Sequence, residues 1–486
     1  MSAVFRLSAL ATSLALAACA VGPDYERPAS AVSARFARDE SQAMQHDAAP
    51  AGTSADADAA FWRGFGDPAL TRLIDAALAA NQDLQLAVSR YDASNALLRE
   101  TRFDRIPTIT ASGQVGHRLT SKDQAFGAPR DQRDKPTSSV GINAAWELDL
   151  FGRVRRAVEA QRAETAASAA DVRAVRIAIA GEVARAYVDL RGSQERLRIA
   201  RENADNQRQT LALINARVGA GRGSELDAAR ARAQVESTTS RIAVYEAAIG
   251  VDEHRLAVLT GQPPGALIGE LDAPAPLPAL VADIDPGTPG DLLRRRPDVA
   301  AAEARLHAAT ARVGVATADL FPRFTLTGLL GSMTSSYGFF RSGSDTNLIA
   351  LGVDWSFLDV GRVRARLAAS NADAAGQLAQ YRQTVLGALE ETENALLRVA
   401  RTRDETTHLE RAATDSARAA QLAHARFTAG AIDYYEVLDA ERTLLQAQDA
   451  AADGRLRSAS ATVALYKALA GGWPSGAGPD APIARR

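Results

Sequence analysis

The 486-residue chain has one cysteine, Cys19, three methionines and six histidines. A single cysteine excludes an internal disulfide framework. The histidines show no metal-ligand spacing with one another or with carboxylates, which argues against a metal centre. The glycine-rich stretch at 219–223 lacks the lysine and the preceding strand of a phosphate-binding loop. We therefore expect no metal, no cofactor and no enzymatic activity.

Lysine is rare in the whole chain, and proline is absent from two long stretches. Lysine occurs only at positions 122, 135 and 467, and with a net charge of −2 the chain has no bulk attraction to nucleic acid. No proline lies between Pro136 and Pro263 or between Pro322 and Pro474, so helices can run unbroken through both stretches.

No segment offers the roughly 18 consecutive apolar residues of a transmembrane helix. A chain of this kind could span a membrane only as a closed barrel of strands.

The sequence contains one structural unit twice. The stretch from Gln82 to Pro107 is echoed 215 residues later, from Pro297 to Pro322. Further matches are offset by 209 residues: Trp146, Gly152, Arg153 and Gly221 recur as Trp355, Gly361, Arg362 and Gly430. The smaller offset indicates a length difference in one loop. Each repeat reads as a short helix, two strands, a very long helix, a tight turn and a shorter return helix.

The helices are predicted to form coiled coils. The long helices, at about 152–216 and 361–427, would each extend roughly 98 Å at 1.5 Å per residue. The return helices are expected at about 225–260 and 433–470, and the short entering helices at about 82–105 and 297–321. Apolar or small residues recur every seven positions at Val183, Leu190, Leu197, Ala204, Leu211 and Val218, and again at Val235, Ile242, Ile249 and Leu256.

Four segments alternate with the period of a strand. In 140–150 and 349–358 one side is apolar, and we expect Ile142, Trp146, Val353 and Trp355 to face lipid. Weaker strands at 108–117 and 323–333 precede them across polar loops at about 118–138 and 334–346. A sheet in a soluble sandwich is the alternative. Because outer-membrane barrels begin at eight strands, four strands require the chain to oligomerise.

The N-terminus resembles a secretory signal that ends in a lipoprotein box. Arg6, an apolar run and the small pair at 17–18 precede Cys19, so residues 1–18 are expected to be removed and Cys19 to carry lipid. An ordinary signal with an incidental cysteine is the alternative. Ala20 replaces the aspartate that favours inner-membrane retention, which indicates the outer membrane.

Several motifs together resemble the TolC family of outer-membrane efflux factors, lipoprotein branch. They are 21–25 (Val-Gly-Pro-Asp-Tyr), 62–68, 294–298 (Arg-Arg-Arg-Pro-Asp), 426–430 and 437–440. The resemblance implies a mainly α fold with a small β-barrel part, in which a homotrimer forms a 12-stranded barrel and a helical tunnel through the periplasm. It also implies a periplasmic adaptor (membrane fusion) protein and an inner-membrane pump, commonly of the resistance-nodulation-division type.

The expected domains follow from the repeats. After the signal comes an N-terminal segment at 19–66, then the first repeat at 67–260, a proline-rich linker at 261–290, the second repeat at 291–470 and a tail at 471–486. The N-terminal segment, linker and tail are expected to pack as a collar around the helices.

Two helical turns are candidate docking tips for the adaptor. Their residues are Gly219, Gly221 and Gly223 in the first repeat, and Ala429, Gly430 and Asp433 in the second. Glycine suits a helix end that reverses through a left-handed residue, and Ser224 and Asp433 are expected to cap the helices that follow. A plain helical hairpin is the alternative interpretation.

The resemblance also suggests a periplasmic gate. Asp439 matches an acidic residue that rings the closed periplasmic mouth in relatives. Phe427 lies where relatives carry an aromatic gate residue, and Glu225 lies where the first repeat of the family contributes an acidic residue to the gate. Arg230 and Arg222 are candidate partners of Asp439, because three copies of that carboxylate around one axis would repel one another. Alternatively, these acids are solvated first-turn residues favoured by the helix dipole.

Taken together, these features predict a passive duct that carries small toxic compounds across the outer membrane. A lipid-anchored periplasmic coiled-coil adaptor or scaffold is one alternative, and a duct for protein secretion or metal export is another. A charge placed at Ile142 or Val353 distinguishes the duct from the scaffold, because only a membrane-inserted strand would reject it.

Overall fold

The computed structural model describes residues 20–29, 32–37, 61–278 and 286–469. The described chain divides into two compact units, and each draws on both repeats. The first unit comprises 20–29, 90–169 and 301–383. The second comprises 32–37, 61–89, 170–278, 286–300 and 384–469.

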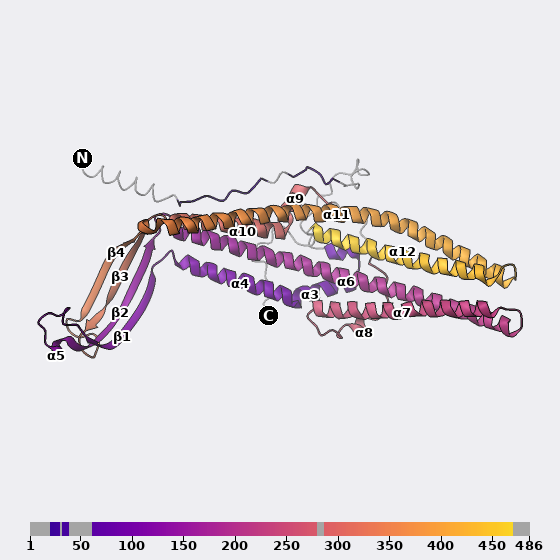
Figure 1. Ribbon diagram of the computed structural model, residues 1–486, viewed down its shortest axis with the longest axis horizontal. Helices are drawn as coiled ribbons and strands as arrows, with labels where there is room; N and C mark the ends of the chain where they lie inside the picture. Colours follow the sequence, from indigo (N-terminus) through magenta and orange to yellow (C-terminus); the bar gives the residue numbers. More distant parts are fainter. Residues whose placement is uncertain (1–19, 30–31, 38–60, 279–285, 470–486) are drawn as a thin grey trace. The chain divides into compact units, whose positions relative to one another are not determined.

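The first unit contains a four-stranded antiparallel sheet in the order β1-β2-β3-β4 (Figure 1). The strands are β1 Thr108–Leu119, β2 Asp134–Leu148, β3 Arg323–Thr334 and β4 Asp345–Asp354. Each repeat supplies one hairpin, and the β2–β3 pairing joins the two. The four predicted strands are therefore confirmed.

Except at the starts of β1 and β3, the strand boundaries differ from the expected ones by one to six residues, most of all in β2 and β4. β2 begins at Asp134, well before residue 140, because the short helix α5 (Arg130–Arg133) shortens the loop. The Arg133 guanidinium holds that loop together by donating to the Thr120 carbonyl at 2.7 Å. β4 ends at Asp354, so Trp355 lies beyond it in the segment that leads to the 3-10 helix η3 (Phe357–Asp359). The alternation continues past the strand, but the backbone pairing does not.

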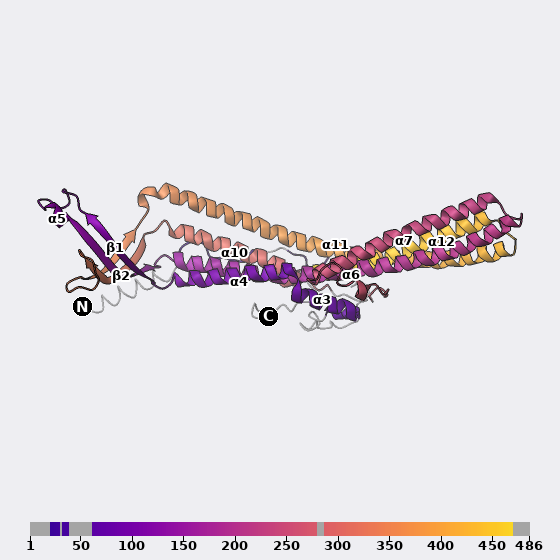
Figure 2. The same cartoon turned by 90° about the horizontal axis from the view of Figure 1, so that it is seen from below.

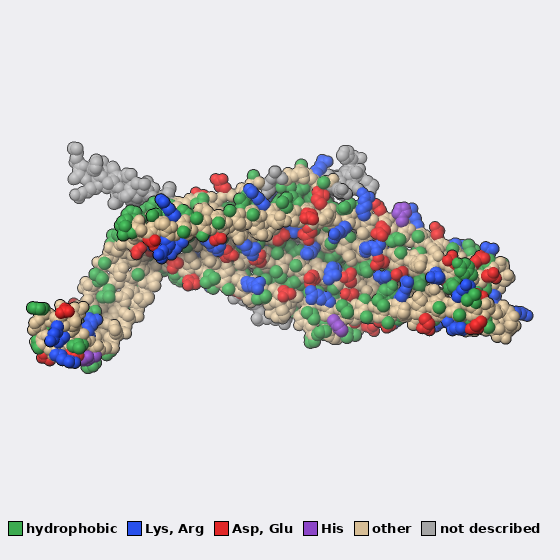
Figure 3. Space-filling view, in the orientation of Figure 1, with side chains coloured by type: hydrophobic (Ala, Val, Ile, Leu, Met, Phe, Trp, Pro, Cys, Tyr) green, Lys and Arg blue, Asp and Glu red, His purple; other side chains and the backbone are tan. Residues whose placement is uncertain are grey.

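The register places apolar side chains on one face of the sheet. Ile142 lies opposite Ala111 and Leu330, and Leu326 lies opposite Trp146 and Leu351. Residues opposite one another share a face, so Ile109, Val115, Phe324 and Val353 belong to the same side. The other side carries Thr110, Ser112, Asn143, Thr325 and Thr327. Charged residues of the strands stand only near strand ends, and Figure 3 shows few on the strands against many along the helices.

Both repeats use the same joint between sheet and helices. Helices α4 (Gln82–Phe103) and α10 (Pro297–Ala318) lead into the sheet, and α6 (Arg153–Gly219) and α11 (Val360–Thr428) leave it. The indole N–H of Trp146 donates to the Arg105 carbonyl at 3.1 Å. In the second repeat, Trp355 donates to the Leu320 carbonyl at 3.1 Å. The duplication therefore extends to single hydrogen bonds.

The second unit holds two helical hairpins that lie side by side in Figures 1 and 2. The C-terminal part of α6 returns as α7 (Glu225–Leu259), and that of α11 returns as α12 (Tyr434–Ala468). These bounds confirm the predicted long and return helices. The seven-residue spacing on α6 also marks buried positions, since Val183, Leu190 and Ala204 are fully buried.

Short elements pack against the helices of this second unit. They are η2 (Phe61–Phe65), α3 (Pro68–Ala80), α8 (Ile268–Leu271) and α9 (Pro289–Arg295). Asp67 caps α3 through the Ala69 and Leu70 amides, and its other carboxylate oxygen accepts from the Tyr187 hydroxyl of α6 at 2.7 Å. Arg191 of α6 donates to the Ala273 carbonyl at 2.8 Å. Polar contacts thus fasten the irregular segments to α6.

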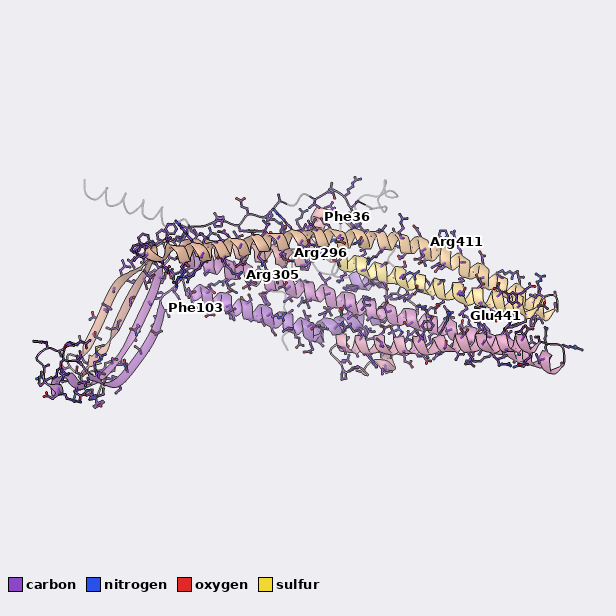
Figure 4. All side chains as sticks on the ribbon, in the orientation of Figure 1. Phe36, Phe103, Arg296, Arg305, Arg411 and Glu441 are labelled. Carbon is purple, nitrogen blue, oxygen red and sulfur yellow. The ribbon has the colours of Figure 1, made fainter. Side chains whose placement is uncertain are left out.

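Arg296, which is labelled in Figure 4 and lies between α9 and α10, contacts residues of three helices. Its guanidinium contacts Asp298 at 2.7 Å and Glu391 of α11 at 2.7 Å, and donates to the Ala468 carbonyl at the end of α12 at 2.8 Å. Nearby lies an apolar cluster that contains Phe36, Leu292, Val399 and Leu465. In the described part of the chain, no helix combines the length and the apolar character required to cross a membrane.

Candidate functional site

The two hairpin turns have the same backbone structure. Gly221 takes φ 70° and Gly430 φ 76°, in the left-handed region that favours glycine. After α6, the Arg222 amide donates to the Arg217 carbonyl at 2.8 Å and the Gly221 amide to Val218 at 2.9 Å. After α11, Ala431 and Gly430 make the equivalent bonds at 2.9 and 3.0 Å. Both turns are Schellman motifs, and the left-handed glycine expected at each helix end is confirmed.

The two predicted caps differ. The Ser224 hydroxyl accepts from the Leu226 amide at 3.1 Å and caps α7. Asp433 stands at the corresponding position of α12 but makes no side-chain cap bond. Its carboxylate is exposed to solvent, which can hydrate it, and the first turn closes through the Glu436 amide and the Asp433 carbonyl at 3.3 Å. The expectation was therefore correct for Ser224 and wrong for Asp433.

An apolar cluster joins the two tips. Its buried members come from all four helices of the hairpins: Ile214, Ala228, Ala231, Phe427, Tyr434, Val437 and Leu438. The Phe427 ring is 5% exposed and lies 6.0 Å from the Tyr434 ring. The Arg217 guanidinium lies over the Phe427 ring, 4.1 Å from the ring centroid. It also donates a hydrogen bond to the Phe427 carbonyl at 3.3 Å. Within the protomer, Phe427 therefore packs one hairpin against the other.

The charged gate candidates make separate contacts within the protomer. Glu225 accepts from Arg232 at 2.7 Å, and Arg230 lies 3.7 Å from Asp227 and 5.7 Å from the Tyr435 ring centroid. Asp439 is exposed, and no residue of the described chain forms an ion pair with it. The protomer does not bring Arg230 or Arg222 to Asp439, whose carboxylate stays available to a neighbouring molecule.

A buried acid that the sequence analysis missed lies close to these candidates. Glu441 is 6% exposed, and its Oε1 lies 2.7 Å from His424 Nε2 of α11 and 3.3 Å from the Thr210 hydroxyl of α6. The hydrogen bond to Glu441 raises the pKa of His424 despite partial burial. A signal was present, because Glu441 follows Tyr434 by seven residues on the buried stripe of α12.

Glu441 belongs to a polar seam between α6 and α12. Arg196, Asn203 and Thr210 are spaced by seven on α6, and their partners on α12 are Asp449, Gln448 and Glu441. Arg196 reaches both Asp449 oxygens at 2.8 and 3.1 Å. Hydrogen bonds in a helix interface fix the register of the helices, because a shifted pairing would leave these groups without partners.

Three of the four candidate lipid-face residues lie on one side of the sheet. Ile142 and Val353 are 54% and 60% exposed on its apolar side, and Trp146 shares that side. Trp355 lies one residue past β4 and is half-exposed. Cys19, the expected lipid carrier, lies outside the described residues. Among the residues that are described, no group of three or more His, Cys, Asp or Glu side chains could hold a metal ion.

These features define a class of protein. A duplicated unit of helical hairpin and β-hairpin, with matched turns and an uncovered apolar sheet face, is typical of an outer-membrane channel with periplasmic helices. Comparison with known proteins gives the same assignment. The family model described as "Outer membrane efflux protein" matches residues 73–262 and 288–471. The chain belongs to this family.

Individual relatives match over nearly the whole chain. Outer membrane protein OprJ of Pseudomonas aeruginosa is 34% identical, over 97% of each chain. Toluene efflux pump outer membrane protein TtgI of Pseudomonas putida is 33% identical, over 95% of this chain and 97% of its own. Among solved structures, the outer-membrane channel OprN superposes with a TM-score of 0.86 at 38% identity, covering 94% of this chain and 100% of that one.

The chain is accordingly the outer-membrane channel component of a tripartite efflux system, with helices that extend into the periplasm. The family consists of channels and not of enzymes. The interpretation as a periplasmic scaffold that never enters the membrane is therefore set aside.

Proposed function

We propose that three copies of the chain form a passive exit duct, in which the three sheets close into one 12-stranded barrel and the helices form a tunnel. The observation that carries this proposal is the sheet of the protomer. Its apolar face is uncovered, and within the described chain β1 and β4 have free edges. Free edges and an exposed apolar face are both unfavourable in water, and pairing with further copies in lipid satisfies both.

The cargo we propose is small toxic compounds. Relatives at about one third identity are named as outer membrane proteins of toluene, solvent and antibiotic efflux pumps. We further propose that a periplasmic adaptor protein docks on the hairpin tips, and that an inner-membrane pump of the resistance-nodulation-division type supplies the energy. Exposed apolar side chains beside the turns, Leu226 at 57% and Tyr435 at 61%, support docking at this end.

The gate we propose lies at the same tips. Three copies of Asp439 would approach one axis, with Phe427 behind them and with Glu225 and Arg230 on the first hairpin of each copy. The support is that Asp439 is exposed and has no ion pair within the described chain, whereas Arg230 is held in contact with the second hairpin through Tyr435. Contacts of Asp439 with basic groups of a neighbouring copy would keep the mouth closed.

The last part of the proposal is a lipid anchor. Removal of residues 1–18 would leave an acylated Cys19 at the N-terminus of the mature protein. A multiply acylated cysteine holds a protein firmly at a membrane, whereas a single chain does so only weakly.

Two adjacent residues on opposite faces of β2 test the membrane role. Ile142→Lys places a charge on the apolar face, and Asn143→Lys, the matched control, places it on the polar face. We expect Ile142→Lys to abolish insertion and drug efflux in cells that lack their own channel, because a cation at mid-membrane costs about 2–4 kcal/mol per copy. Asn143→Lys should insert. Equal insertion and efflux of both variants would overturn the assignment of the lipid face, and electron microscopy of the wild type would separately check threefold symmetry.

A further inference from the structure

The segment that follows Cys19 lies against two helices of the first unit. We call residues 20–27 the N-terminal strap. It includes the motif Val-Gly-Pro-Asp-Tyr at 21–25, which takes no part in the sheet, the hairpin tips or the gate candidates. The Val21 amide donates to the Phe151 carbonyl at 3.1 Å, at the point where β2 gives way to α6. The strap thus begins at the junction of sheet and helix.

Two glycines allow the backbone of the strap to come very close. Gly152 takes φ 84°, and a Cβ there would stand 2.5 Å from the Cβ of Ala20. Gly22 takes φ 91°, and a Cβ there would stand 2.6 Å from the Cα of Gly314 on α10. Real atoms do not approach so closely, so each position requires glycine while the strap is in place.

Arg156 of α6 binds the strap from beneath. Its side chain is 5% exposed and donates to the Val21 and Gly22 carbonyls at 3.4 Å each, and to the Asp24 carboxylate at 2.6 Å. It also donates to Glu159 at 2.8 Å. Burial alone would lower the pKa of Arg156, but the bonds to Asp24 and Glu159 raise it. A buried, charged guanidinium therefore depends on the strap for part of its hydrogen bonding.

The far end of the strap is fixed by an aromatic stack and an ion pair. The Tyr25 ring stacks on His307 of α10 with 4.4 Å between centroids and 13° between planes. The Tyr25 hydroxyl donates to Glu303 at 3.3 Å, and Arg27 reaches the other oxygen of Glu303 at 2.8 Å. His307 also lies 2.9 Å from Glu159, the second partner of Arg156. The contacts of both ends of the strap are therefore linked.

We propose that Arg156 is a positioning residue for the lipid anchor: by docking the strap it holds the acylated N-terminus beside the junction of sheet and helix. This proposal rests on the proposed acylation of Cys19. Ala20, which makes the contact with Gly152, is the residue bonded to Cys19, so a docked strap keeps the point of lipid attachment within one residue of this contact. The acyl chains then enter the phospholipid next to the end of the sheet that joins the helices.

Such an arrangement makes the insertion of lipid and sheet cooperative. With a long flexible tether between lipid and sheet, the sheet samples a large volume and its effective concentration at the membrane surface is low. A short fixed attachment raises that effective concentration. The strap therefore determines whether acylation helps the sheet to insert, beyond merely keeping the protein near the membrane.

The test compares two backgrounds of the full mature chain, one acylated at Cys19 and one produced behind an ordinary signal with Cys19→Ser. The half-time of insertion into phosphatidylcholine vesicles is measured for the wild type, for Arg156→Gln, and for Arg162→Gln, an exposed arginine on the same helix as matched control. We expect acylation to speed insertion of the wild type and of Arg162→Gln about tenfold or more. In Arg156→Gln the ratio of the insertion rates with and without acylation should fall to about one, so that acylation no longer speeds insertion.

A second variant guards against a simple packing defect. Gly22→Ala lifts the strap by steric contact with Gly314 and leaves Arg156 in place, and the same loss of the acylation gain is expected. If either variant slows both backgrounds equally, or keeps the full gain, the positioning role is refuted. Mass spectrometry of the wild-type N-terminus separates the two proposals, because a chain without lipid refutes the anchor itself, whatever the strap does.

Discussion

Replacement of Arg296 by Gln should destabilise the protein more than the same replacement of Arg294. The Arg296 side chain is 10% exposed, and its partners Asp298 and Glu391 are about 40% exposed. The bond to the buried Ala468 carbonyl is charge-assisted and contributes about 1.5–3 kcal/mol. Each partly exposed ion pair adds about 0.5–1 kcal/mol. We therefore expect the free energy of unfolding to fall by about 3 kcal/mol.

Urea unfolding of the detergent-solubilised protein, followed by far-ultraviolet circular dichroism, measures this change. Arg294→Gln is the matched control, since its ion pair with Asp291 is exposed on both sides and should contribute less than about 1 kcal/mol. If Arg296→Gln is as stable as Arg294→Gln, the contact with the end of α12 does not stabilise the fold, and the reasoning from burial is wrong.

Three further changes have expected outcomes. Gly430→Ala should lower stability by about 1–2 kcal/mol, because alanine is strained at φ 76°; an unchanged thermal midpoint would contradict this. Ser224→Ala should lose about 1 kcal/mol with the cap bond, whereas Asp433→Ala should be nearly neutral in the same melting assay. His424→Gln should destabilise most in acid. Because Glu441 raises the pKa of His424, the ion pair is complete below about pH 6.5 and is lost as pH rises through the raised pKa. Equal effects at about pH 6 and about pH 9 would exclude the ion pair.

The sequence was sufficient to predict elements whose signals are local. Proline-free stretches and the glycines at 221 and 430 located the helices and turns, and the alternation around Ile142 located the apolar face of the sheet. The end of β4 was missed because alternation records which way side chains point, and not whether a neighbouring strand is present. At Trp355 the backbone has left the ladder, although the side-chain pattern continues.

The remaining features depend on residues far apart in the chain. The burial of Phe427 follows from the packing of both hairpins, and that of Glu441 from a contact with Thr210 more than 200 residues away. Likewise, nothing in the sequence around Val21 indicates that its carbonyl will accept a hydrogen bond from Arg156. Asp433 shows that a suitable residue at a suitable position need not make the cap, since solvent competes for its side chain.

The two hairpin turns have the same backbone conformation but expose different side chains. Around the common Schellman motif, the first presents Arg222, Gly223 and Ser224, and the second Ala431, Ile432 and Asp433. In the proposed trimer, six turns would therefore alternate between a basic, glycine-rich form and a more apolar one. A partner that binds all six would meet two non-equivalent sites, so its binding isotherm should resolve two affinities in a ratio of three sites to three.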